Sequence, residues 1–88
     1  MSIYLDSNSK WYDWAEDNGY DSDTEYDREE EVFKRGANVS SYFKKDDDTY
    51  ALVSWYSDYD NGRMDIEVQQ EGLRRYEEQV VTTKVVYK

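Results

Sequence analysis

Two turn sequences in the second half of the chain limit the fold more than any other feature. Asn61-Gly62 is the preferred pair for a two-residue β-hairpin turn, because both central positions of that turn need a positive φ. Apolar and polar side chains alternate on both sides of the pair, which is typical of half-buried strands. Residues 49–70 are therefore predicted to form an antiparallel hairpin.

The two-residue turn also sets a register for this hairpin. If Asp60 pairs with Arg63, Trp55 lies opposite Val68 and one face of the hairpin becomes apolar. This face is assigned to the core and carries Val53, Trp55, Ser57, Tyr59, Met64, Ile66, Val68 and Gln70. The opposite face is polar and aromatic, with Tyr50, Leu52, Ser54, Tyr56, Asp58, Asp65, Glu67 and Gln69.

An acidic run at residues 46–48 marks a second turn upstream of the first. A three-residue loop at this run pairs Phe43 with Ala51, Ser41 with Val53 and Val39 with Trp55. These residues fall on the core face that the first hairpin defines, so the two turns agree. Residues 38–70 are thus expected to form a β-meander.

The last part of the chain is rich in valine and threonine, which favour strands. We expect a further strand over residues 79–88, with Val81, Thr83, Val85 and Tyr87 facing the core. Residues 71–78 would connect it to the hairpin, with room for one helical turn. Residues 3–5 can add an edge strand.

The first third of the chain favours helix. Ser7 or Ser9 can cap a helix over residues 10–18, with Trp11, Trp14 and Ala15 on its apolar side and Gly19 as its stop. A second helix is expected over residues 25–35, with Thr24 as its N-cap. Strand is the alternative there, because Asp21, Asp23, Glu25, Asp27 and Glu29 fall at every second position.

The predicted fold is a single α+β domain over residues 1–88. One or two N-terminal helices pack on a three- to four-stranded antiparallel sheet, with residues 1–37 acidic and helical or mixed and residues 38–88 forming the sheet. A disordered chain is the alternative to this fold, because high net charge with low hydrophobicity favours disorder. Aromatic residues make up 17% of the chain, and their large buried area favours a folded domain.

Composition excludes several classes of function. The 88 residues include no cysteine and no histidine, which removes disulfides, thiol and imidazole nucleophiles, and Cys/His zinc sites. A pair of carboxylates could still hydrolyse glycosides, but it needs a cleft that a chain of this size hardly forms. We therefore expect no enzyme activity and no cofactor. The N-terminal residues lack the features of a signal peptide, so a cytoplasmic protein of a bacterial host is expected.

The net charge of −10 is concentrated at one end of the chain. Residues 1–32 contain eleven acids and two bases, whereas residues 33–88 contain ten acids and nine bases. Calcium binding by the acidic segment 21–31 is one hypothesis. An EF-hand loop needs glycine at its sixth position and a bidentate glutamate at its twelfth. A loop starting at Asp21 would have Tyr26 and Val32 at these positions, so the motif does not match. Looser ion sites at residues 46–48 or 58–60 stay open, and we predict no metal site.

The density of acids suggests that the chain presents phosphate-like charges. Duplex DNA carries one negative charge per about 1.7 Å of axis, and carboxylates on alternate strand residues or on successive helical turns recur at about 6–7 Å. Tyrosines between the acids are typical interface anchors. The predicted partner-binding residues are Asp13, Glu16, Asp17, Tyr20, Asp21, Asp23, Glu25, Tyr26, Asp27, Glu29, Glu30 and Glu31.

At the level of a class, the chain resembles phage-encoded inhibitors that mimic nucleic acid. The resemblance lies in its small size, its acidity and the charge pattern of residues 13–31, and it extends to anti-CRISPR proteins, anti-restriction proteins and inhibitors of uracil-DNA glycosylase. It implies an inhibitor that blocks the PAM or target-DNA site of a bacterial defence nuclease, most simply an anti-CRISPR. The implied partner is a basic nucleic-acid-binding protein, such as a CRISPR effector or a restriction enzyme.

The charge itself argues against direct binding to nucleic acid or to an anionic membrane, and the chain is expected to be a monomer or a dimer.

Alternative functions remain open. The chain is also similar to small immunity proteins that neutralise a cognate nuclease toxin. An acidic ion-binding or structural module is a further reading, and a merely solvated acidic face is another. The aromatic and acidic face of the 49–70 hairpin is a competing interface.

Overall fold

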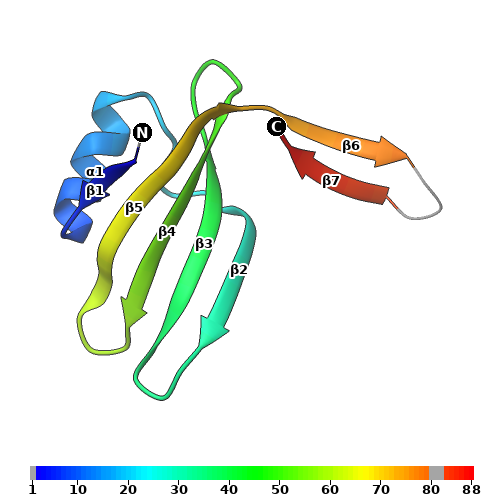
Figure 1. The fold of residues 1–88 in the computed structure, drawn as a ribbon. Helices are drawn as coiled ribbons and strands as arrows, with labels where there is room; N and C mark the ends of the chain where they lie inside the picture. The colour runs from blue at the N-terminus through cyan, green and yellow to red at the C-terminus, as the bar shows by residue number, and fades with distance from the viewer. Residues whose placement is uncertain (1, 80–82) are drawn as a thin grey trace.

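The computed structural model describes residues 2–79 and 83–88, which form one helix and seven strands (Figure 1). The elements are β1 (Ile3–Leu5), α1 (Asn8–Asp17), β2 (Tyr26–Val32), β3 (Gly36–Lys44), β4 (Tyr50–Asp58), β5 (Gly62–Leu73), β6 (Arg75–Gln79) and β7 (Thr83–Tyr87). An antiparallel sheet has the strand order β1-β5-β4-β3-β2, and β6 pairs with β7 in a separate two-stranded sheet. The predicted α+β class is confirmed, although the main sheet has five strands.

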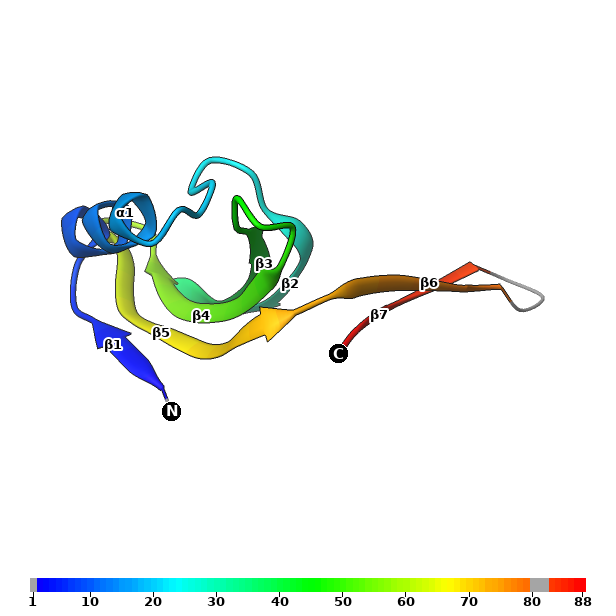
Figure 2. The ribbon, with the colours of Figure 1, turned by 90° about the horizontal axis from the view of Figure 1, so that it is seen from above.

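The main sheet is curved, and α1 packs against its hollow side (Figure 2). We call this side the inner face and the opposite side the outer face. The inner face holds the core, whose buried members are Trp11, Ala15, Tyr20, Ala37, Val39, Phe43, Ala51, Val53, Trp55, Ile66 and Val68. The β6–β7 hairpin extends away from the sheet, and we call it the arm (Figures 1 and 2).

The predicted helix is confirmed as α1, although it spans Asn8–Asp17 and not residues 10–18. Ser7 is the N-cap, and its side chain accepts a hydrogen bond from the Lys10 N–H at 3.4 Å. Trp11 is buried and its ring packs on Phe43, with 4.8 Å between the ring centres. Gly19 follows the C-cap with a φ of 80°, a conformation that ends helices at little cost for glycine.

The β3–β4 hairpin has the register that its acidic turn predicts. Val39 pairs with Trp55 and Phe43 with Ala51, and the loop is the expected acidic run at residues 46–48. Asp48 takes the left-handed conformation in this loop, with a φ of 66°. Because the register is correct, the predicted inner face of these two strands is correct as well.

The predicted register of the β4–β5 hairpin is wrong. Asp58 pairs with Gly62, so the loop has three residues instead of two. The carboxylate of Asp58 accepts the N–H groups of Asp60 and Asn61 at 2.8 and 3.0 Å, which stabilises the longer loop. A bulge at Asp65, with a φ of 51°, then returns the following residues to the inner face.

The bulge explains which core residues of this hairpin were predicted correctly. Four of the assigned residues are buried, namely Val53, Trp55, Ile66 and Val68. Tyr59, Met64 and Gln70 were also assigned to the core, but they are exposed. The first two lie in or beside the loop, where the register error is largest.

The second helix that was expected over residues 25–35 does not form, and the strand alternative is the observed structure. Residues 26–32 form β2 at the edge of the sheet, paired with β3. The segment lacks an apolar stripe, so a helix could not bury one side, whereas an edge strand needs only the backbone of its neighbour. Tertiary pairing therefore decides its conformation.

The C-terminal prediction is correct in part: β7 lies within the strand expected over residues 79–88, but its expected place in the main sheet is wrong. Residues 71–78 contain no helical turn, since β5 continues to Leu73 and β6 begins at Arg75. The last strand, β7, pairs with β6 and does not join the main sheet. Of the residues expected to face the core, Val81 lies outside the described residues, Val85 is half-buried, and Tyr87 packs on the outer face, where its ring stacks on Tyr42.

Candidate acidic binding surface

The predicted partner-binding residues do not lie on one surface. They divide among the exposed side of α1 with the loop after it, the inner face of β2, and the outer face of β2. The expected alternation fails because Asp27 has a φ of 48° and the pairing of β2 with β3 shifts between Tyr26 and Glu29. The structure therefore separates acids that are adjacent in the sequence.

The first group lies on α1 and on the following loop, and we call it the acidic rim. Its members are Asp13, Glu16, Asp17, Asp21 and Asp23, all of which are exposed. The loop crosses above the hollow of the curved sheet from α1 toward β2 (Figure 2). Within residues 2–79 and 83–88, none of these five carboxylates forms an ion pair.

The core fixes the backbone beneath the acidic rim. Trp11 anchors α1, and Tyr20 is buried just after the helix ends. The Asp21 N–H donates to the Lys44 carbonyl at 2.9 Å, and the Asp21 carboxylate accepts the Asp23 N–H at 3.0 Å. This second hydrogen bond favours the charged form, so the pKa of Asp21 is lowered from its usual value. The backbone of the rim is thus ordered before any partner binds.

Two carboxylates of the rim occupy the last turn of α1. The C-terminal end of a helix carries partial negative charge, so an acid there is unfavourable by about 0.3–1 kcal/mol. Glu16 and Asp17 lie in this turn, which holds no basic residue. Asp13 and Asp17 repel each other in addition, because they are four residues apart on one side of the helix. These acids lower the stability of α1.

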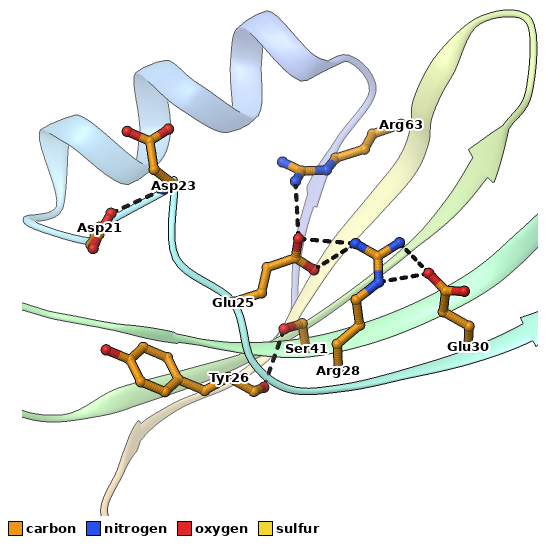
Figure 3. Close-up of polar contacts among 8 residues, drawn as sticks. All are labelled: Asp21, Asp23, Glu25, Tyr26, Arg28, Glu30, Ser41 and Arg63. Atoms are coloured by element: carbon orange, nitrogen blue, oxygen red, sulfur yellow. Dashed lines mark hydrogen bonds and ion pairs between the residues drawn. The ribbon is translucent and has the colours of Figure 1, made fainter.

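The second group is neutralised within the molecule (Figure 3). Arg28 donates to both carboxylate oxygens of Glu25, at 3.1 and 3.0 Å, and its Nε donates to Glu30 at 2.7 Å. Arg63 reaches Glu25 from β5, with 3.8 Å between Nη2 and Oε2. The charges of Glu25 and Glu30 are therefore already paired, and the contact of Glu25 with Arg63 joins the acidic segment to β5.

The two arginines also cover the indole ring of Trp55. The guanidinium carbon of Arg63 lies 4.7 Å from the ring centre and that of Arg28 lies 5.9 Å from it. Arg63 further lies 5.9 Å from the ring centre of Tyr12. This network was not predicted from the sequence. Its available signal was Arg28, the one base in residues 21–31.

The third group, Glu29 and Glu31, lies on the outer face of β2. Glu29 pairs with Ser40 and Glu31 with Asn38, so both project away from α1. Both are exposed. They belong to a different side of the molecule from the acidic rim, and one flat partner surface cannot meet both.

The carboxylate of Asp27 contacts two residues of the arm. It accepts a hydrogen bond from the Tyr87 hydroxyl, and Arg75 Nε lies 3.8 Å from it. Burial raises the pKa of Tyr87, and the hydrogen bond to Asp27 raises it further. Asp27 thus connects the base of the arm to the main sheet.

The two predicted tyrosine anchors have structural roles. Tyr20 is only 6% exposed, stacks on Trp14 and donates its hydroxyl to Glu71 at 2.8 Å. Tyr26 is half-buried and packs edge-on against Tyr50. Tyr20 therefore belongs to the core and cannot offer its ring to a partner, which corrects the expectation that it lies open among the acids.

The described part of the chain holds no group of three or more acidic side chains that could bind a metal ion. Within the same residues, no helix has the length and apolar character needed to cross a membrane. Comparisons with protein-family models, with curated proteins and with solved structures found no match.

Proposed function

We propose that the protein is a binding inhibitor without catalytic activity that mimics nucleic acid. The acidic rim occupies the positively charged DNA site of a bacterial defence nuclease, in the cytoplasm of the host cell. An anti-CRISPR protein that blocks the PAM or target-DNA site of its effector is the most specific form of this proposal. The class resemblance of the sequence suggests this target, and the rim suggests the mechanism.

The location of Glu16 and Asp17 is the observation that carries the proposal. Both are exposed, and neither forms an ion pair with another described residue. Both lie where the helix dipole disfavours negative charge. An acidic surface that only kept the protein in solution could use positions that leave the helix stable, so these positions favour a role in binding.

The fixed backbone of the rim supports the same mechanism. A surface that is ordered before binding loses less conformational entropy when it meets its partner. Asp13 and Asp17 are one helical turn apart, about 6 Å along the axis, and a DNA site is built to contact charges repeated at short intervals along a backbone. Arginine and lysine side chains of such a site can form charge-assisted hydrogen bonds to the rim.

The proposal is tested by competition with DNA. The protein is added to purified CRISPR effectors and restriction enzymes, and displacement of labelled duplex DNA is measured. The variant Asp13→Asn, Glu16→Gln, Asp17→Asn, Asp23→Asn should displace DNA about a hundredfold less well, because it loses several charge-assisted contacts. Its control changes four acids in the two hairpin loops, Asp46→Asn, Asp47→Asn, Asp48→Asn and Asp60→Asn, and should act like the unaltered protein.

Salt provides a second readout of the same experiment. Charges on a DNA site are screened over about 10 Å at 0.1 M salt, so the association rate should fall steeply as salt rises. A rate that does not depend on salt would contradict the proposal. Equal losses in the rim variant and its control would also contradict it, as would a failure to displace DNA from every enzyme tested.

A further inference from the structure

The outer face of the sheet has a covered half and an open half. At the covered half, Tyr87 of the arm stacks on Tyr42 and packs edge-on against Tyr50. The open half is hollowed by two adjoining depressions of about 610 and 570 Å³, which share Ser54 and Asp65. Together they form one groove on the outer face, lined by residues of all five strands from β2 to β1.

The strand register arranges the residues of the groove in two rows. The first row follows the paired positions Glu29, Ser40, Ser54, Glu67 and Tyr4, one on each strand of the sheet. The second row follows Glu31, Asn38, Tyr56 and Met64, with Asp65 in the bulge beside it. Both rows have acids on β2 and on β5 and uncharged side chains between them. Since neighbouring strands lie about 4.8 Å apart, two acidic walls stand about 14 Å apart across a neutral floor.

A glycine shapes the floor of the groove. A Cβ on Gly36 would lie 2.6 Å from the hydroxyl of Tyr56, so only glycine lets that ring lie across β3. Glycine inside a strand often marks a place where another group approaches closely. The rest of the floor is made of short polar side chains, Asn38, Ser40 and Ser54. The groove is thus open to an extended chain.

The walls carry charge that the described residues leave uncompensated. Glu29, Glu31, Asp65 and Glu67 form no ion pair within residues 2–79 and 83–88. The base that borders the groove is Lys10, which is held by Asp6 at 2.8 Å. A ligand that matches this groove must be positively charged on both of its sides.

We propose that this groove binds a lysine- or arginine-rich segment of a partner protein in extended conformation. Side chains alternate to opposite sides of an extended chain, so basic residues can reach both acidic walls. The floor residues Asn38, Ser40 and Ser54 can hydrogen-bond to its backbone, and the face of Tyr56 can stack with an arginine. This site is separate from the acidic rim, and it does not depend on the identity of the enzyme proposed above.

The proposal is tested with a fluorescein-labelled octapeptide in which pairs of adjacent arginines alternate with pairs of serines, so that an extended peptide has arginines on both sides. The same peptide with glutamine in place of arginine is the comparison. Anisotropy measures binding to the full chain. The groove variant Glu29→Gln, Glu31→Gln, Asp65→Asn, Glu67→Gln should bind the arginine peptide at least about tenfold more weakly. The rim variant Asp13→Asn, Glu16→Gln, Asp17→Asn, Asp23→Asn removes the same charge and should change binding less than about threefold.

A steric variant keeps the test independent of charge. Asn38→Trp fills the floor of the groove, leaves the net charge unchanged and places an aromatic residue in a strand that tolerates it. It should also weaken binding at least about tenfold, with its melting temperature as a check on folding. Equal weakening by the groove and rim variants would show diffuse attraction and overturn the proposal. Undiminished binding by a folded Asn38→Trp protein, or no preference for arginine, would overturn it as well.

Discussion

The guanidinium of Arg63 lies 4.7 Å from the centre of the Trp55 ring and covers it on the inner face of the sheet. Arg63 belongs to β5 and Trp55 to β4, and the β4–β5 loop brings them together. Glu25 joins Arg63 to Arg28, which covers the same ring. One aromatic residue thus connects the acidic segment to the core.

Removing Arg63 should therefore destabilise the whole domain. We expect Arg63→Ala to lower the free energy of unfolding by about 1–3 kcal/mol, because Glu25 loses a partner and Trp55 loses its cover. Arg63→Lys should recover only part of this, since an ammonium cannot stack as a guanidinium does. Urea denaturation followed by tryptophan fluorescence measures both variants.

The exposed Arg35, in the turn between β2 and β3, provides the control for this prediction. Arg35→Ala should change the free energy of unfolding by less than about 0.5 kcal/mol. If Arg63→Ala had an effect as small as that, the network over Trp55 would have no part in stability.

The acids of the rim that lie at the end of α1 should lower the stability of the protein. Asp17→Asn removes a charge that opposes the dipole of α1, so it should raise the free energy of unfolding by about 0.3–1 kcal/mol at low salt. Asp6→Asn should act in the opposite direction, because Asp6 precedes the N-cap and pairs with Lys10 at 2.8 Å. The melting temperatures of both variants, in low salt and in 0.5 M salt, measure these two opposite changes in stability. Destabilisation by Asp17→Asn would remove the argument that this acid is retained for function.

Gly36 should be intolerant of any side chain. A Cβ at this position would lie 2.4 Å from the carbonyl oxygen of Ser57 and 2.6 Å from the hydroxyl of Tyr56. We expect Gly36→Ala to lower the free energy of unfolding by about 1–3 kcal/mol, because a backbone atom cannot move aside alone. Chemical denaturation measures it, and NMR shifts of the Tyr56 ring should report the displaced groove floor. Unchanged stability would mean that the strands accommodate the methyl group.

The protein should lose stability at alkaline pH. Burial raises the pKa of Tyr20, and its hydrogen bond to Glu71 raises it further. Tyrosine in an unfolded chain titrates near pH 10, so the folded state holds this proton more tightly. The resulting stabilisation is fully present below pH 10 and is lost as the pH rises above that value.

Urea denaturation between pH 8 and pH 11.5, at constant ionic strength, measures this dependence. Tyr20→Phe should flatten the decline above pH 10, whereas Tyr59→Phe should not, because Tyr59 is 62% exposed. The same decline in both variants would assign the alkaline loss to other groups.

The elements that could be predicted from the sequence are those with local signals. The helix α1 has its cap, its apolar side and its glycine stop within thirteen residues, from Ser7 to Gly19. The loop at residues 46–48 has a length that only one register of the flanking strands satisfies. The two-residue turn that is preferred at residues 61–62 does not form, because the hydrogen bonds of the Asp58 carboxylate favour a longer loop.

The strand β2 and the arm had no such signals. Five of the seven residues 26–32 are charged, and their conformation depends on the free edge of β3. The arm depends on the pairing of β6 with β7 and on the contact of Tyr87 with Tyr42. Both segments pair with the next strand along the chain, but the contact of Tyr87 with Tyr42 joins residues far apart in the sequence, whose distance cannot be read from periodicity.

For the candidate site, the sequence by itself determined the amount of negative charge, its concentration near the N-terminus and the absence of thiol and imidazole chemistry. Only the tertiary structure decided which acids can meet a partner. Glu25 is paired with Arg63 and Tyr20 with Glu71, whereas Glu29 and Asp17 face solvent on different sides of the fold. The reason is physical: the availability of a carboxylate depends on the bases and rings around it in space, and these neighbours come from distant parts of the chain.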